Sequence, residues 1–483
     1  MSSRPVVAVR SPVHGLARRS LPVIDVIAQP LSAVAPSAAA TTLPLLVAAA
    51  SGAGAVLVAV AVALVLAVAV AACVNQFTRR IAATGSLYTF VVRGLGPRAG
   101  VVTGVAMLLG YGFVASFALA GAGWSAQRLA ARAWPGLATG DAPALVAVVA
   151  LGAAVWWVLR RGIRRSARVT LVVEVVSMTL IGVLVVALLA AAGPGAVARA
   201  ATPQTTVPDV VVGTVVALTA FVGFESAATL GAEARRPFRT VPRAILWTAA
   251  GTGALYLAAA WAQLVGYARA GTSLADGVSP VDELTTAFGV AWAGPVLDAA
   301  VVASFVACAM ASTTALVRVL FTMGREGLAP RGLGRVHPGL GTPTPALRVT
   351  LPLLTAVPVV AVLAGARLWE VMQALLVVAA GGYVAAYALV CAAVPPFLRR
   401  VGERTRGPVV LALATAVVLS GALAGMLLLA HGTPRRAGAW AFAILLGAGA
   451  VAGLARLRRR PPLRSRLGVY DEPVAADLLG EAA

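Results

Sequence analysis

The sequence predicts an all-α polytopic membrane protein with about twelve transmembrane helices, on two observations. The 483 residues are 60% hydrophobic and only 12% charged, and the mean hydropathy of +0.91 lies well above that of soluble domains. Apolar runs long enough to cross a bilayer, which takes roughly 20 helical residues, also recur along the whole chain. They lie near residues 21–50, 54–77, 98–123, 142–159, 169–193, 207–231, 244–267, 287–318, 346–366, 369–394, 407–430 and 437–455.

The basic residues predict the orientation of these spans. All 39 are arginines that lie between the apolar runs, so the net charge of +22 reflects membrane topology and predicts no nucleic-acid partner. With both termini in the cytoplasm, 32 arginines fall on the inner side. The seven outer ones are Arg128, Arg132, Arg199, Arg269, Arg367, Arg435 and Arg436. We expect a multi-pass protein of the cytoplasmic (inner) cell membrane, surrounded by lipid, with both termini cytoplasmic.

The first apolar run is expected to be a membrane span rather than a signal peptide. At residues 21–50 it is about twice as long as the 7–15 residues of a signal core. The three cysteines, Cys73, Cys308 and Cys391, lie in apolar runs without pairing or metal-ligand spacing. We therefore expect buried packing, with no disulfide, metal or cofactor.

Two spans contain helix-breaking sequences. The first span carries Gln29–Ser37, in which Pro30 and Pro36 remove backbone donors. The sixth carries Phe221–Glu225, where Gly223 lies between two aromatics and a carboxylate stands at membrane depth. Such a carboxylate is usually functional, and irregular backbone at this depth requires protein or trapped water around it.

Interrupted spans five positions apart predict a LeuT-like inverted repeat of five plus five helices, with helices 1 and 6 broken. The expected organisation is a cytoplasmic tail, a transporter core, two peripheral helices 11 and 12, and a second cytoplasmic tail. These parts cover residues 1–20, 21–400, 401–457 and 458–483, with the two repeats at about 21–193 and 207–394.

Three loop segments carry a further pattern. They are Thr84–Phe90 with Gly94–Pro97, Phe221–Ala227 followed by Glu233 and Pro237–Ala244, and Arg318–Pro330 followed by His337-Pro338 and Thr342-Pro343. In this order, over roughly residues 20–400, the chain resembles the amino acid–polyamine–organocation (APC) permeases. The resemblance implies a permease for an amino acid or related amine, driven by a proton or sodium gradient or by exchange.

The two breaks supply the candidate substrate site. Backbone amides of Ser32, Ala33, Val34 and Ala35 precede a half-helix that begins near Pro36, and such an N-terminal end suits a substrate carboxylate. The alternative is a proline kink satisfied by neighbouring helices. Phe221 and Phe224 would flank the substrate around Gly223, as lid and wall, or serve as ordinary packing. The resemblance places Tyr111 of span 3 at the pocket; the alternative is a buried tyrosine bonded to any carbonyl.

Coupling residues are less closely defined. Glu225 could carry a proton or bridge the broken helices, and in similar permeases the matching glutamate is thought to sense protonation. Ser312, Thr313 and Glu174 could form an oxygen-lined sodium site or a proton relay with carbonyls at the first break, unless the hydroxyls bond to their own helix. Some relatives place a lysine there, which this chain lacks.

Other charges have two interpretations each. Asp25 could belong to a gate near Arg18-Arg19 or be a solvated helix end, and Asp298 could bond helices or pair with an outer arginine. Cytoplasmic arginines near Glu233, namely Arg235, Arg236, Arg239 and Arg243, could form a gate, but such charges usually only orient the spans.

The expected function is secondary active transport of an amino acid or small amine by alternating access, with proton coupling first and sodium coupling or exchange as alternatives. The small residues of the first break favour a neutral or singly charged substrate. A non-enzyme is expected because His14, His337 and His431 are scattered. An inorganic-ion cotransporter or a receptor remains the alternative class, and the protein could be a monomer or a homodimer.

Overall fold

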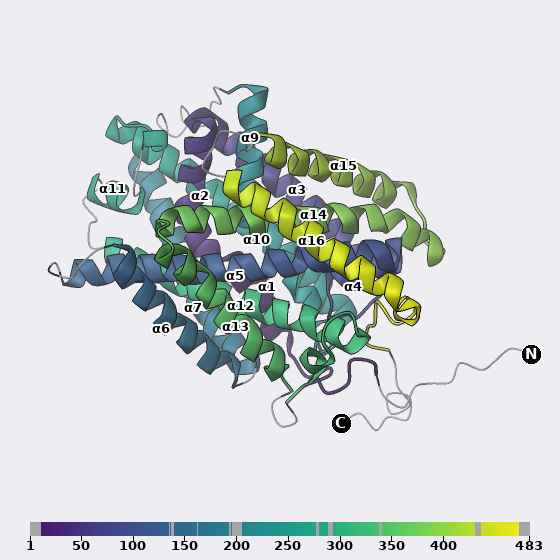
Figure 1. The fold of residues 1–483 in the computed structure, drawn as a ribbon. Coiled ribbons are helices and arrows are strands. Elements are labelled where there is room, and N and C mark those ends of the chain that lie inside the picture. The colour runs from purple at the N-terminus through teal and green to yellow at the C-terminus, as the bar shows by residue number, and fades with distance from the viewer. Residues whose placement is uncertain are drawn as a thin grey trace, which may run out of the picture.

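A computed structural model describes residues 11–472, apart from residues 135, 137–139, 162, 193–194, 196–204, 277–279, 288–292, 338–340 and 430–435. Residues 1–10 and 473–483 of the two expected tails, with Arg199 and Arg435 of the arginine count, lie outside the described residues. The described chain forms helices (Figure 1) and two isolated β-bridges. The α-helices are α1 (Val23–Val34), α2 (Pro36–Ser51), α3 (Val56–Thr78), α4 (Leu87–Leu95), α5 (Pro97–Ala133), α6 (Asp141–Leu159), α7 (Ile163–Ala192), α9 (Val207–Leu218), α10 (Pro237–Ala270), α11 (Pro280–Ala287), α12 (Ala293–Glu326), α13 (Thr344–Leu363), α14 (Leu368–Arg400), α15 (Arg406–Leu429) and α16 (Arg436–Arg459).

Twelve spans predicted from the sequence have a counterpart among the described residues. Twelve helical segments are long and apolar enough to cross a membrane, and each coincides with one predicted run. Several helices extend beyond the apolar run. Helix α12 continues past its predicted run to Glu326, so Arg318, at the end of that run, lies buried within the helix rather than in a loop.

The first span is interrupted, as predicted, but over a shorter segment. Helix α1 continues through Pro30 to Val34, and the chain turns at Ala35, whose φ of 51° is left-handed. Pro36 then begins α2 at a position where its missing N–H costs nothing. The expected opening from Gln29 to Ser37 is therefore confined to the junction at Ala35.

The sixth span is also interrupted. Helix α9 begins with a capping box between Thr206 and Asp209, and the short 3-10 helix η2 (Thr219–Phe221) continues it. The backbone then extends at Val222 and becomes left-handed at Gly223, with φ of 108°. A tighter 3-10 helix, η3 (Phe224–Leu230), completes the span.

The interrupted spans occupy the centre of the bundle. Helix α1 contacts α7, α10, α12 and η3, while α2 contacts α7, α9, α10 and α12. The long helix α5 packs closely on both α12 and α14, and α15 and α16 lie against α14 from outside (Figure 1). Because helices surround both interruptions, their irregular backbone is enclosed by protein.

Two segments outside the spans cover the face where α1 begins, which is predicted to be cytoplasmic. The N-terminal arm (residues 11–22) leads directly into α1, and Leu21 forms a β-bridge with Ala234. The C-terminal strap (residues 461–472) follows α16 and crosses the same face, where Asp471 N–H donates to the Ala82 carbonyl at 2.8 Å.

Candidate functional site

The two interruptions touch each other. A Cβ built on Gly223 would lie 3.0 Å from Ala33 Cβ and 3.1 Å from its carbonyl oxygen. That carbonyl also accepts a hydrogen bond from Cys308 Sγ of α12 at 3.1 Å, and Gln29 Nε2 donates to Ala311 O at 2.8 Å. The sequence folds this way because only glycine combines a left-handed φ with so close a backbone approach.

Glu225 is fully buried beside the second interruption, between two tyrosines. Tyr111 of α5 donates its hydroxyl to Oε1 at 2.8 Å, and Tyr387 of α14 donates to Oε2. The N–H of Gly223 in turn donates to the Tyr387 hydroxyl at 3.4 Å. The carboxyl group therefore joins α5, α14 and the broken sixth span in one hydrogen-bonded unit.

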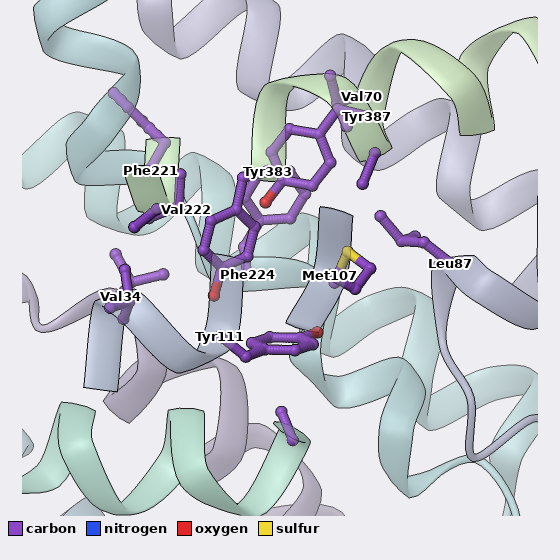
Figure 2. Close-up of a cluster of buried hydrophobic side chains, with 14 of the residues drawn as sticks. Val34, Val70, Leu87, Met107, Tyr111, Phe221, Val222, Phe224, Tyr383 and Tyr387 are labelled. Carbon is purple, nitrogen blue, oxygen red and sulfur yellow. The ribbon is translucent and has the colours of Figure 1, made fainter. Parts of the chain in front are cut away.

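The two tyrosines of this unit belong to a cluster of buried aromatic and aliphatic side chains (Figure 2). Phe224 stacks on Tyr387 with ring centroids 5.4 Å apart, and Tyr111 meets Tyr383 edge to face at 5.4 Å. Phe221 points the other way, edge to face with Tyr256 of α10, and the Tyr256 hydroxyl bonds the Ala220 carbonyl at 3.2 Å. Both phenylalanines are almost completely buried.

Three buried hydroxyls near the interruptions have no hydrogen-bond partner within the described chain. They belong to Ser32 on the last turn of α1, to Ser226 of η3 and to Tyr383 of α14. A buried hydroxyl usually has a partner. Unused hydrogen-bonding groups of this kind are what a bound polar molecule could satisfy.

The predicted peptide amides at Ser32, Ala33, Val34 and Ala35 lie mostly within helix. The N–H of Ala35 donates to the Ser32 carbonyl at 3.2 Å. On the other side of the junction, Ala38 N–H donates to Ser304 Oγ at 3.4 Å. The first turn of α2 after Pro36 is therefore the helix N-terminus that the interruption presents.

Glu174 of α7 is fully buried against this first turn. Ser37 Oγ donates to its Oε2 at 3.4 Å, its Oε1 has no protein partner in the described chain, and Ser304 of α12 lies beside it. Glu174 thus forms a second buried carboxyl site, beside the start of α2.

Ser312 and Thr313 are not part of the Glu174 site, which corrects the expected grouping. Ser312 is eight residues further along α12 than Ser304, about 12 Å of helix, and its Oγ lies 3.9 Å from Cys308 Sγ. The Thr313 hydroxyl lacks a partner in the described chain and faces a separate small cavity. The residues lining that cavity are Leu159, Thr313, Thr314, Val317, Arg318, Thr342, Pro343 and Leu347.

Asp298 and Asp25, the two other carboxylates that the sequence places next to the membrane, each lie near an arginine. Asp298 contacts Arg132 at 2.8 Å, as one of its two interpretations predicted. Asp25 lies 3.6 Å from Arg168 rather than beside Arg18 and Arg19.

Glu233 forms a two-point ion pair with Arg318, at 2.7 and 3.1 Å. This pair, rather than the neighbouring surface arginines, ties the end of the sixth span to α12.

Sequence reasoning missed Tyr383, Tyr387, Ser37 and Ser304. A signal for the tyrosines exists in Gly381-Gly382-Tyr383, because Gly382 packs against the Ala106 and Gly110 backbone and two tyrosines four residues apart share one helix face. Among the residues that the structure describes, no three His, Cys, Asp or Glu side chains form a group that could hold a metal ion.

Comparison with known proteins agrees with this geometry. The family model for amino acid permeases matches residues 31–431. The chain is 26% identical to the branched-chain amino acid permease BcaP of Bacillus subtilis and 25% identical to the low-affinity putrescine importer PlaP of Escherichia coli K12. Each match covers 56% of this chain and 59% of the relative. An uncharacterized transporter of Mycobacterium tuberculosis is 34% identical over 126 residues, which are 26% of this chain and 28% of the relative.

The family match includes both interruptions, the Glu225 unit and all but the ends of the helical bundle. The chain therefore belongs to the amino acid permease family.

Proposed function

We propose that this protein is a secondary active transporter that moves a neutral or singly charged amino acid across the cytoplasmic membrane by alternating access. Alternating access requires a site between elements that can rock against each other, and two touching interruptions at the bundle centre supply such a site. The observation that carries the proposal is the Gly223–Ala33 contact. We further propose that residues 21–193 and 207–394 are inverted repeats, and that both termini are cytoplasmic.

The α-carboxylate of the substrate would bind the first turn of α2. Its partial positive charge suits an anion, and the hydroxyls of Ser32 and Ser37 stand on either side of the Ala35 turn. Binding there would separate Ala33 from Gly223, because the two interruptions now leave no space between them.

The substrate side chain would face the rings of Phe224, Tyr111 and Tyr383. These surroundings are apolar, with one unsatisfied phenol on Tyr383. The carboxyl of Glu225 is already held by Tyr111 and Tyr387, so no further acid is provided for a second substrate charge. An aliphatic or small polar side chain fits this arrangement best.

Protons are the proposed coupling ion, and Glu225 is the proposed carrier. Glu225 belongs to the sixth span and accepts hydrogen bonds from tyrosines of α5 and α14. Protonation turns one of its carboxyl oxygens into a hydrogen-bond donor. It would therefore change these bonds, and with them the position of the sixth span relative to α5 and α14. Glu174, with one oxygen lacking a protein partner, is the proposed second protonation site or an oxygen ligand of sodium. Exchange without net coupling uses the same contacts.

A small amine is the second candidate substrate. Four aromatic rings near Glu225 could hold a cation by cation–π contact, and the putrescine importer is a relative. The carboxylate position at α2 would then contribute nothing to binding. Comparing the uptake of an amino acid with that of its decarboxylated amine therefore distinguishes the two candidate substrates.

The test is uptake into proteoliposomes of labelled amino acids and amines, with a pH gradient, a sodium gradient or preloaded substrate imposed separately. Accumulation of an amino acid under a pH gradient supports the proposal. Accumulation only with a sodium gradient would indicate sodium coupling instead of proton coupling, and accumulation only with preloaded substrate would indicate exchange. No accumulation of any compound by folded protein would contradict the proposed function and favour an inorganic ion or a non-transport role.

A further inference from the structure

The C-terminal strap is built into the face where α1 begins. Its apolar side chains Leu463 and Leu467 are buried, and Gly468 packs so closely on Val92 that a Cβ there would lie 2.7 Å from it. Val469 packs on a small apolar cluster that includes Val13 and Leu16 of the N-terminal arm. This segment is therefore packed like a core element rather than a solvated tail.

The strap is anchored on the helical bundle at Gly468 and Val469. Glu326, at the end of α12, accepts the N–H groups of both Gly468 and Val469 on its Oε1, at 2.7 and 2.8 Å. Its other oxygen accepts the Tyr88 hydroxyl of α4. Arg93 of α4 donates to the Gly468 carbonyl at 2.9 Å, with its guanidinium over the ring of Tyr470 at 4.6 Å.

The other end holds the N-terminal arm. Asp471, whose side chain is 3% exposed, accepts a hydrogen bond from Ser11 Oγ at 2.7 Å and from Arg18 Nε at 2.6 Å. Arg18 also donates to the main-chain oxygen of Glu472 at 3.1 Å. Charge-assisted bonds to a buried carboxylate are among the stronger contacts available to a side chain.

The arm in turn is continuous with the moving parts of the proposed site. Arg19 N–H donates to Ala232 O at 3.0 Å, and Leu21 exchanges two backbone bonds with the end of the sixth span, at Glu233 O and Arg235 N. Pro22 alone separates Leu21 from α1. If α1 tilts away from the bundle, the arm must move with it, whereas the strap is fixed to α4 and α12.

We propose that the strap is a latch on the inner gate: Asp471 holds the arm, and so α1, in the closed position, and its contacts with Ser11 and Arg18 break before α1 opens the site to the cytoplasm. This proposal rests on the proposed transport function only for the identity of the molecule that passes the gate. The latch itself concerns the movement of α1, which can be measured without any substrate.

The test measures that opening without any substrate. The reporter is Ala28→Cys, a fully buried α1 position, in a background with Cys73, Cys308 and Cys391 changed to alanine. A membrane-impermeant maleimide is applied from the inner face, and the labelling rate is followed. Asp471→Ala should label about tenfold faster, the shift expected when charge-assisted hydrogen bonds are lost.

Glu472→Ala is the matched control, because Arg18 contacts the main chain of Glu472 and not its carboxylate. It should label at the parent rate. Asp471→Asn and Ser11→Ala, which remove less and are expected to fold, should give intermediate rates. If Asp471→Ala does not fold, the labelling rates of Asp471→Asn and Ser11→Ala test the latch instead.

Equal labelling of the parent, Asp471→Asn and Ser11→Ala would overturn the latch. A folded Asp471→Ala variant that labels at the parent rate would also overturn the latch. Neither result depends on the uptake panel, so failure of the latch and failure of the proposed transport are distinguishable.

Discussion

Gly223 lies so close to Ala33 across the two interrupted spans that a Cβ added to Gly223 would be 3.1 Å from both the carbonyl carbon and the carbonyl oxygen of Ala33. Gly223 also adopts a φ of 108°, which L-residues with a side chain avoid. The contact therefore depends on glycine for two independent reasons. It also joins the two elements that would have to separate when a substrate enters.

Gly223→Ala should abolish uptake while the protein remains folded. The added methyl group requires Ala33 to shift, and a left-handed alanine costs about 1–2 kcal/mol, which a bundle of this size tolerates. Uptake and thermal unfolding of the purified variant measure the two effects. Gly251→Ala on α10, where an added Cβ meets nothing within 4 Å, should leave uptake unchanged. Normal uptake by Gly223→Ala would mean that the site lies elsewhere.

Tyr383→Phe and Tyr387→Phe should separate substrate binding from structure. Tyr387 bonds both Glu225 and the Gly223 N–H, so its loss leaves buried groups unpaired and should cost about 1–3 kcal/mol. The Tyr383 hydroxyl has no protein partner in the described chain, so its loss breaks no hydrogen bond within the protein and should not lower stability, but it should raise the KM. If the Tyr383→Phe variant is destabilised but has a normal KM, the hydroxyl stabilises the fold and does not bind substrate.

The spans and the interruptions could be predicted because each depends on local sequence. Apolar length sets a span, and the pairs Pro30 with Pro36 and Phe221 with Gly223 mark where helices weaken. The limits of the first interruption could not be predicted, because Pro30 lies within α1 and only packing decides which proline breaks the helix. The burial of Arg318 within α12 could not be predicted either, because it depends on a partner, Glu233, that is 85 residues away.

The site could be predicted only in part, for the same reason. Glu225 was evident as a carboxylate at membrane depth, and Tyr111 from the family resemblance. Tyr387 and Ser304 lie on helices whose own sequences carry no charge near them, and they join the site through contacts across the bundle. Ser312 and Glu174 lie in different places because depth along two helices cannot be matched from sequence alone.

Glu225→Gln should abolish accumulation driven by a pH gradient while substrate exchange continues. Glutamine keeps the size and can still bond one tyrosine, but it cannot take up or release a proton. Uptake with a pH gradient and counterflow with preloaded liposomes measure the two activities. Glu174→Gln, the matched change at the other buried carboxyl, tests the second site in the same assay. Undiminished gradient-driven accumulation by Glu225→Gln would assign coupling to Glu174 or to sodium.

The ion pair between Glu233 and Arg318 should behave as a buried unit. Both side chains are almost completely buried, so Arg318→Met alone should cost about 3–5 kcal/mol by leaving an unpaired buried carboxylate. Arg318→Met with Glu233→Leu should recover most of that loss, because two apolar groups need no partner. Thermal unfolding of the two single variants and the double variant closes the cycle.

The exposed pair of Arg80 and Glu403 is the comparison. Arg80, by its hydrogen bond and charge, holds the pKa of Glu403 below its usual value. The contribution of this pair is therefore present above about pH 4.3 and is lost as the pH falls through the lowered pKa. Because solvent screens it, Glu403→Ala should leave unfolding at neutral pH nearly unchanged. Equal losses from Arg318→Met and Glu403→Ala would mean that the Glu233 pair is not buried in the membrane protein, and the packing of the sixth span against α12 would then need revision.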